Sequence, residues 1–248
     1  MTFASRAIPR LIGLCLLLGL FLQPQLFEPV FRPLANTSAP SIYAQAELWS
    51  LALSHVVLAL GATLGALILA VSAAVVVTRS WGASFLPLSR SIANIGQTFP
   101  PVAVLALAVP ALGFGDRPTF VALLIYGLLP IFETTLTGLT TLPAPVMEAA
   151  RGSGMTEWQC LRTVELPLAL PLIVAGFRLS LVIGLSTAAI GSTVAARTLG
   201  EVIIAGLQSN NLAFIVQGGL AVAGLAVLAH DALTALEIWA RRRTRLAV

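Results

Sequence analysis

Glu133, Arg178 and Asp231 are ionisable residues inside long apolar stretches of the sequence. Charged groups in a membrane span usually pair with one another or line a water-filled cavity. Each lies about seven to ten residues from the same side of the membrane, and at about 1.5 Å per residue their depths agree within roughly 5 Å. We therefore expect Arg178 to meet one of the two acids, either in a static ion pair or along a conduction path.

The remaining sequence offers no catalytic chemistry. It contains no CxxC, HExxH, GxxxxGK(S/T) or GxSxG motif, which are signatures of thiol or zinc sites, nucleotide binding and nucleophilic catalysis. His55 and His230 lack the spacing of metal ligands and are interpreted as polar positions in helix packing. We predict no cofactor and no enzymatic activity, so energy for any work must come from another subunit or from an ion gradient.

The stretch Val146–Pro171 is polar within an apolar sequence. Pro143 and Pro145 end the preceding stretch and favour the start of a helix, which places Glu148 in its first turn. One side of this helix has almost no side-chain volume and consists of Ala149, Ala150, Gly152, Ser153 and Gly154. Two glycines cost about 1 kcal/mol each of helix stability, a cost that a docking surface or a sharp turn would explain.

A second short helix is predicted after Thr156. Its apolar residues Trp158, Leu161 and Val164 have helical spacing and are expected to pack against the rest of the protein. Pro167 then redirects the chain into the next apolar stretch.

The elements that must position these residues are membrane-spanning helices. Only 10% of the 248 residues are charged, 58% are hydrophobic, and the mean hydropathy is +0.95. These values exclude an ordinary soluble domain and predict an all-α, polytopic membrane protein. Six apolar segments are predicted, at residues 8–30, 48–77, 87–112, 119–140, 168–190 and 212–239.

The arginines orient these segments, since all fourteen basic residues are arginine. With the N-terminus in the cytoplasm, ten arginines are cytoplasmic: Arg6, Arg10, Arg79, Arg90, Arg151, Arg162, Arg241, Arg242, Arg243 and Arg245. Arg32, Arg117 and Arg197 then lie outside. The positive-inside rule therefore places both termini and the Val146–Leu166 stretch in the cytoplasm. The arginines are spread along the chain, so no nucleic-acid partner is predicted.

Three regions follow from this topology. Residues 1–47 form an N-terminal transmembrane helix and an extracytoplasmic linker, 48–240 the main transmembrane domain, and 241–248 a basic cytoplasmic tail. The first apolar run also resembles a signal peptide, with AQA at 44–46 as its cleavage site. About twenty residues separate the two, which favours an uncleaved first span.

The polar stretch resembles a known motif. Glu148-Ala149-Ala150, three residues, Gly154, nine residues, Val164, one residue and Leu166-Pro167 resemble the EAA motif of type I ABC-importer permeases. Residues 143–167 are called the coupling segment below. From Ser91 to Glu237 the chain resembles the osmoprotectant branch of that family, the glycine betaine/choline/proline permeases, in stretches such as SIANIGQTFPPVAVLALAVPALGFG and LLIYGLLPIFETTLTGL. It departs at Phe132-Glu133-Thr134 and at STVAARTLGEV, both near the expected conduction path.

The resemblance implies a function. The chain would be the permease subunit of an importer in the bacterial inner membrane, surrounded by lipid and paired with a second permease copy or a sister permease. Two cytosolic ATPase subunits would grip the coupling segments through Glu148, Ala149, Ala150, Gly154, Val164, Leu166 and Pro167. An extracytoplasmic binding protein would supply the solute, and it would also recognise a quaternary ammonium group, because the aromatic residues of this chain are scattered in sequence. Alternatives are a permease for an amino acid, sulfonate or nitrate, or an ion-coupled secondary transporter.

Overall fold

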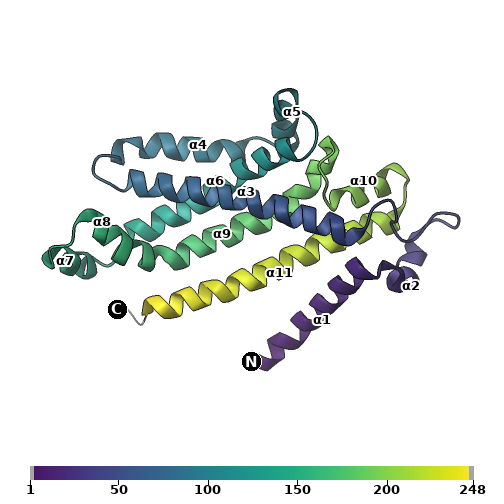
Figure 1. The fold of residues 1–248 in the computed structure, drawn as a ribbon, viewed down its shortest axis with the longest axis horizontal. Coiled ribbons are helices and arrows are strands. Elements are labelled where there is room, and N and C mark those ends of the chain that lie inside the picture. The colour runs from purple at the N-terminus through teal and green to yellow at the C-terminus, as the bar shows by residue number, and fades with distance from the viewer. Residues whose placement is uncertain (1–2, 246–248) are drawn as a thin grey trace. The chain divides into compact units, whose positions relative to one another are not determined.

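The computed structural model describes residues 3–245, and within that range the chain forms helices and turns without strands. Four helical runs are long and apolar enough to cross a membrane. They are α3 (Leu48–Val77), α6 (Asp116–Thr140), the run Glu157–Val194 that contains α9 (Leu166–Ala188), and α11 (Leu212–Arg245) (Figure 1). Each run contains an 18-residue window with at most two charged residues, so the apolar runs of the sequence correctly predicted them.

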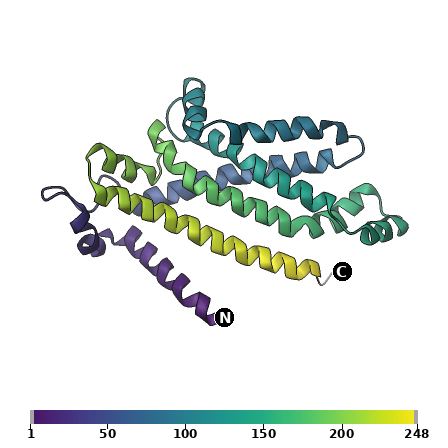
Figure 2. The same cartoon turned by 180° about the vertical axis from the view of Figure 1, so that it is seen from behind.

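The other two predicted spans are broken. The segment predicted at 8–30 consists of α1 (Phe3–Leu22) and a short helical run at Pro24–Leu34, bent by 114°. The segment predicted at 87–112 consists of α4 (Leu86–Thr98) and α5 (Pro101–Leu112), bent by 100° (Figure 2). Counting each bent pair as one span gives six. Both bends fall at prolines, because Pro24 and Pro100 cannot donate the backbone hydrogen bonds that would continue α1 and α4.

The chain divides into two compact units, whose boundaries fall inside α3, α6, α9 and α11 and between α4 and α5. The first unit contains the residues up to Ala62, Pro100–Leu123 and Val182–Ala229. Its core joins α1 to α10 (Gly200–Gln208) and to the first half of α11. His55 is fully buried in this unit, where its Nδ1 accepts from Leu199 N–H at 3.3 Å and its Nε2 lies 2.8 Å from the Leu185 carbonyl. His55 is therefore a polar packing residue that joins α3 to two other segments.

The second unit contains Thr63–Phe99, Leu124–Leu181 and the residues from His230 onward. Alanines at 66, 70 and 74 form a buried stripe on α3 that packs against α6 and α9. The helices α6 and α9 approach so closely that a Cβ at Gly176 would lie 2.0 Å from the Thr134 hydroxyl. Small residues at helix contacts are typical of membrane proteins, where close backbone approach replaces the hydrophobic driving force.

Side chains of the helices α4 and α6 donate hydrogen bonds to backbone carbonyls of the other helix, at points where the helical pattern is interrupted. Pro130 has no N–H for the Tyr126 carbonyl one turn earlier, and the Gln97 amide of α4 donates to that carbonyl at 3.0 Å. In return, the Tyr126 hydroxyl donates to the carbonyl of Phe99, just beyond the end of α4. Unpaired backbone groups are costly away from water, so these two bonds hold the break in place.

Candidate functional site

The coupling segment begins with α7 (Ala144–Gly152), which follows Pro143 at its N-cap. Because the helix starts at Ala144, Glu148 lies in the second turn and not in the first turn as predicted. Glu148 and Ala149 are exposed, whereas Ala150 is buried. An exposed carboxylate beside an exposed alanine is a surface that a partner protein can approach.

Gly154 ends α7 with a specific backbone geometry. Its N–H donates to the Arg151 carbonyl at 3.0 Å, and the N–H of Met155 donates to the Ala150 carbonyl at 3.3 Å. This pair of bonds is a Schellman motif, which needs a residue in the left-handed region at the position of Gly154. The φ of Gly154 is +77°, and a Cβ there would meet nothing within 4 Å. Gly154 is therefore required by the turn, and the space around it is open to a partner.

A capping box starts the second helix of the coupling segment, α8 (Glu157–Cys160). The Thr156 hydroxyl accepts from Gln159 N–H, and the Gln159 side chain accepts from Thr156 N–H at 2.8 Å. A π-helical stretch, Leu161–Glu165, then leads into α9. The coupling segment is thus joined without a flexible linker to a membrane-spanning helix.

The buried face of this region differs from the prediction at one residue. Leu161 is buried and Val164 is half-buried, as expected, but Trp158 is 62% exposed. The guanidinium of Arg162 lies over the Trp158 ring at 5.2 Å from its centroid. Leu161, Glu165 and Ala169 of this stretch are buried, and Trp158 lies at the surface.

Glu165 connects the coupling segment to Arg79, which lies two residues after the end of α3. Its two carboxylate oxygens accept from Arg79, with Nη1 to Oε1 at 3.1 Å and Nη2 to Oε2. The side chains are only 14% and 7% exposed. The hydrogen bond to Glu165 is the largest of the effects that raise the pKa of Arg79. Sequence reasoning missed this pair, because nothing in the sequence links residues 86 positions apart.

A pocket of 380 Å³ lies beside this ion pair. Arg79 and Glu165 form part of its wall, and Arg151 and Glu157 of the coupling segment add further charge. The arrangement is a polar cleft between the coupling segment and the residues that follow α3, within the second unit.

Glu133 also forms an ion pair, but its partner is Arg90 of α4. The Arg90 Nε lies 2.6 Å from Oε1 and its Nη2 lies 3.0 Å from Oε2. The side chains are 48% and 37% exposed. Glu133 therefore does not meet Arg178, and it helps to hold α4 against α6.

Arg178 of α9 pairs instead with Glu237 of α11, at 3.0 Å from Nη2 to Oε2. Its Nη1 lies 3.4 Å from His230 Nδ1, and Glu237 also binds Arg241 at 2.8 Å. Asp231 is half-buried on α11, and a role for it in the conduction path remains a prediction. The rotation of each helix decides the partner of each charge, and spacing along the chain does not give that rotation.

Comparisons with known proteins agree with this architecture. The family described as "Binding-protein-dependent transport system inner membrane component" matches residues 66–236. The osmoprotectant import permease protein OsmY of Salmonella typhimurium is 37% identical over 199 residues, covering 80% of this chain and 83% of that protein. The carnitine transport permease protein OpuCD of Listeria monocytogenes is 42% identical over 147 residues, which are 59% of this chain and 66% of that protein.

A solved structure shows the same fold. The inward-facing MetNI methionine ABC transporter aligns with a TM-score of 0.70 at 21% identity, over 78% of this chain and 95% of that chain. The chain therefore belongs to the binding-protein-dependent transport system inner membrane component family, the permease subunits of ABC importers.

Proposed function

We propose that this permease imports a small osmoprotectant that carries a substituted ammonium group, such as glycine betaine, carnitine or choline. The similarity to relatives that are named for such solutes carries this proposal. Besides the Salmonella and Listeria proteins, the glycine betaine/carnitine/choline transport system permease protein OpuCD of Bacillus subtilis is 39% identical over 148 residues. Proline, which the sequence resemblance also suggested, is not named for these relatives.

The coupling segment is the surface for a separate ATPase subunit in this proposal. Glu148 and Ala149 are exposed, Gly154 is open on its Cβ side, and the pocket beside Arg79 can receive a side chain of the partner. Two ATPases, a second permease and an extracytoplasmic binding protein would complete the importer. Hydrolysis of ATP would take place in the ATPase subunits.

Movement would pass from the ATPase to the membrane helices through rigid joints. The π-helical stretch continues directly into α9, and the Arg79–Glu165 pair connects the same stretch to the end of α3. A shift of the coupling segment would then move α9 and α3 together, a rigid-body transition of the kind that alternates access to a pathway. Val164, Leu166 and Pro167 lie at this joint and would keep it stiff.

The proposed orientation places the coupling segment and both termini in the cytoplasm. The support is the excess of arginines on that side, ten against three. The loop between the end of α1 and the start of α3 would then face the extracytoplasmic side.

Reconstituted importer in proteoliposomes tests the proposal. With binding protein outside and ATP inside, we expect uptake of radiolabelled glycine betaine or choline, and ATP hydrolysis that the loaded binding protein stimulates. Gly154→Trp should insert normally but abolish stimulated hydrolysis, because the side chain would project from the open side of the turn. Gly152→Ala is the matched control, since its Cβ also meets nothing within 4 Å and it sits in regular helix.

Two results would contradict the proposal in different ways. Normal stimulated hydrolysis in Gly154→Trp would remove the coupling role of this turn. Uptake of an amino acid, sulfonate or nitrate in place of the ammonium solutes would leave the coupling role intact and overturn the substrate class.

A further inference from the structure

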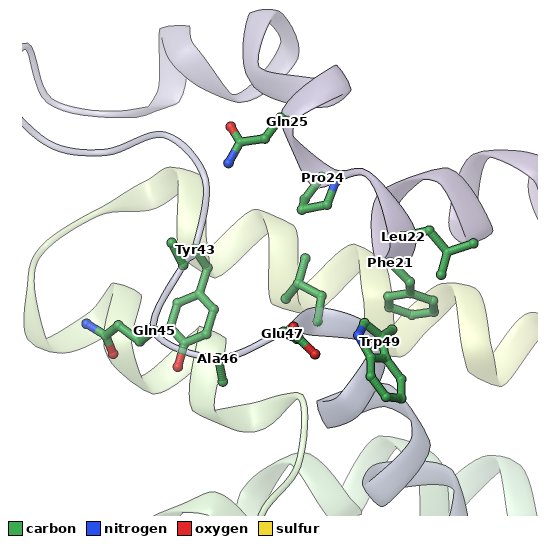
Figure 3. A pocket seen from close by; sticks show the side chains of 11 residues that line it. Phe21, Leu22, Pro24, Gln25, Tyr43, Gln45, Ala46, Glu47 and Trp49 are labelled. Atoms are coloured by element: carbon green, nitrogen blue, oxygen red, sulfur yellow. The ribbon is translucent and has the colours of Figure 1, made fainter.

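The fold gathers three aromatic residues around a carboxylate in the first unit, although they are scattered in the sequence. A pocket of 410 Å³ lies between the C-terminal end of α1 and the start of α3. Figure 3 shows Phe21, Tyr43 and Trp49 on its walls, with the Glu47 carboxylate between the Tyr43 ring and the other two rings. The side chain of Gln25 and the loop residues before Glu47 complete the lining.

Two of the three rings are held in place by the core of the unit. Tyr43 and Phe21 are both buried, and the Tyr43 ring packs edge-to-face against Phe214 with 5.6 Å between ring centroids. The Tyr43 N–H also donates to the Gln217 side chain of α11 at 3.0 Å. Trp49 differs, because it is 48% exposed and forms the open side of the pocket. A ligand would therefore contact two aromatic rings that are already fixed by packing. It would also contact the exposed Trp49 ring, whose fluorescence would change on binding.

The pocket is negatively charged. Glu47 is the one charged residue among the eleven that line it. Within the part of the chain that the structure describes, no side chain donates a hydrogen bond to the Glu47 carboxylate or pairs with it. A second carboxylate, that of Glu201, affects Tyr43 of the pocket. Burial and the charge of Glu201 both raise the pKa of the Tyr43 phenol.

These features select one chemical class of ligand. An anion would be repelled by the exposed carboxylate of Glu47, and a neutral apolar molecule would gain nothing from its charge. A small, strongly hydrated cation would gain little from the rings, whereas a substituted ammonium spreads its charge over methyl groups that fit against aromatic faces.

We propose that this pocket binds a substituted ammonium group, with Phe21, Tyr43 and Trp49 contacting its methyl groups and Glu47 neutralising its charge. Two sources share this chemistry, the transported solute and the headgroup of a phospholipid. The identification with the solute rests on the proposed function, whereas the binding chemistry does not.

Fluorescence of Trp49 tests the proposal on the full-length permease. Trp81, Trp158 and Trp239 are replaced by Phe, which leaves Trp49 as the one indole. The protein is placed in nanodiscs of phosphatidylglycerol, a lipid without an ammonium group, and titrated with tetramethylammonium and with choline. We expect a saturable change in Trp49 emission with both cations, and none with the neutral isostere of choline in which carbon replaces nitrogen.

Variants assign the response to the pocket. Glu47→Gln should weaken binding about fivefold or more, because the variant removes an opposite charge at contact distance from the ligand. Gln45→Glu, which adds a carboxylate to the lining, should tighten it severalfold. Glu28→Gln is the matched control, since this exposed acid belongs to the same unit but lies outside the pocket, and its titration should equal that of the parent.

Lipid composition separates the two sources. A response to free choline in phosphatidylglycerol assigns a solute site. A Trp49 shift that appears only after phosphatidylcholine is added, and is lost in Glu47→Gln, assigns a headgroup site, and either result supports the ammonium chemistry. No response to either, or equal responses in Glu47→Gln and the parent, overturns the proposal. These titrations need neither ATP nor transport, so a failed uptake assay would not affect them.

Discussion

Breaking the Arg79–Glu165 ion pair should separate ATP hydrolysis from transport. The change is Glu165→Leu or Arg79→Leu, each of which leaves one charge of a nearly buried pair without its partner. Removal of one member of a buried pair costs roughly 3–5 kcal/mol, whereas replacement of both by apolar residues is often close to neutral. A loss of about 3 kcal/mol shifts an equilibrium by more than about a hundredfold, which is enough to detach the coupling segment from the end of α3.

The double variant, in which both Arg79 and Glu165 are replaced by Leu, isolates the free energy that the ion pair itself contributes. A thermodynamic cycle from melting of the purified permease should give a coupling free energy of about 2 kcal/mol or more between Arg79 and Glu165. In proteoliposomes, each single variant should hydrolyse ATP but import at least about tenfold less solute per ATP, because hydrolysis no longer moves α3 with α9. Arg162→Leu is the control, since Arg162 is exposed on the same stretch and contacts Trp158 at the surface.

The result that would refute this reasoning is equally definite. A coupling free energy below about 0.5 kcal/mol, the size expected of independent sites, would show that the pair does not act as a joint. Single variants that melt normally and keep the parental ratio of solute to ATP would show the same for the mechanism.

Three further predictions concern individual residues. Gly154→Ala should destabilise the coupling segment by about 1–2 kcal/mol, because the φ of +77° at this position is unfavourable for a residue with a side chain. Gly152→Ala should stabilise the segment by about 1 kcal/mol, and the rates at which a protease cleaves the segment compare the two variants. Gly96→Val should separate α4 from α6 and lower the melting temperature, since a Cβ would lie 2.4 Å from the Ile125 carbonyl oxygen; Gly152→Val, in open space, should do so far less. Burial, followed by the charge of Asp116, raises the pKa of Glu201 against the opposing effect of Arg197, so the folded state holds this proton more tightly than the unfolded state. Stability should therefore fall as pH rises from the ordinary value of 4.5 through the raised pKa, and melting of Glu201→Gln between about pH 4 and pH 8 should lose that part of the slope.

The aromatic pocket and the partners in the ion pairs are features that the sequence alone did not predict. The sequence predicts matching depths for Glu133 and Arg178, but Glu133 pairs with Arg90 and Arg178 with Glu237. The rotation of each helix about its axis decides which side chains meet, and that rotation depends on packing between small residues of different helices. Phe21 lies in one pocket with Tyr43 and Trp49 because the bend after α1 returns the chain to the start of α3.

The sequence by itself determined the class of the protein, most spans and the place of the coupling segment. Apolar length, proline positions and the glycine at 154 act locally, through the cost of exposing backbone groups to lipid and the strain of a left-handed residue. Only the tertiary structure decided that Glu165 is bound to Arg79, that Trp158 faces outward, and that three aromatic rings surround Glu47. These are contacts between residues far apart in the chain, and their energies depend on burial and distance that no local pattern contains.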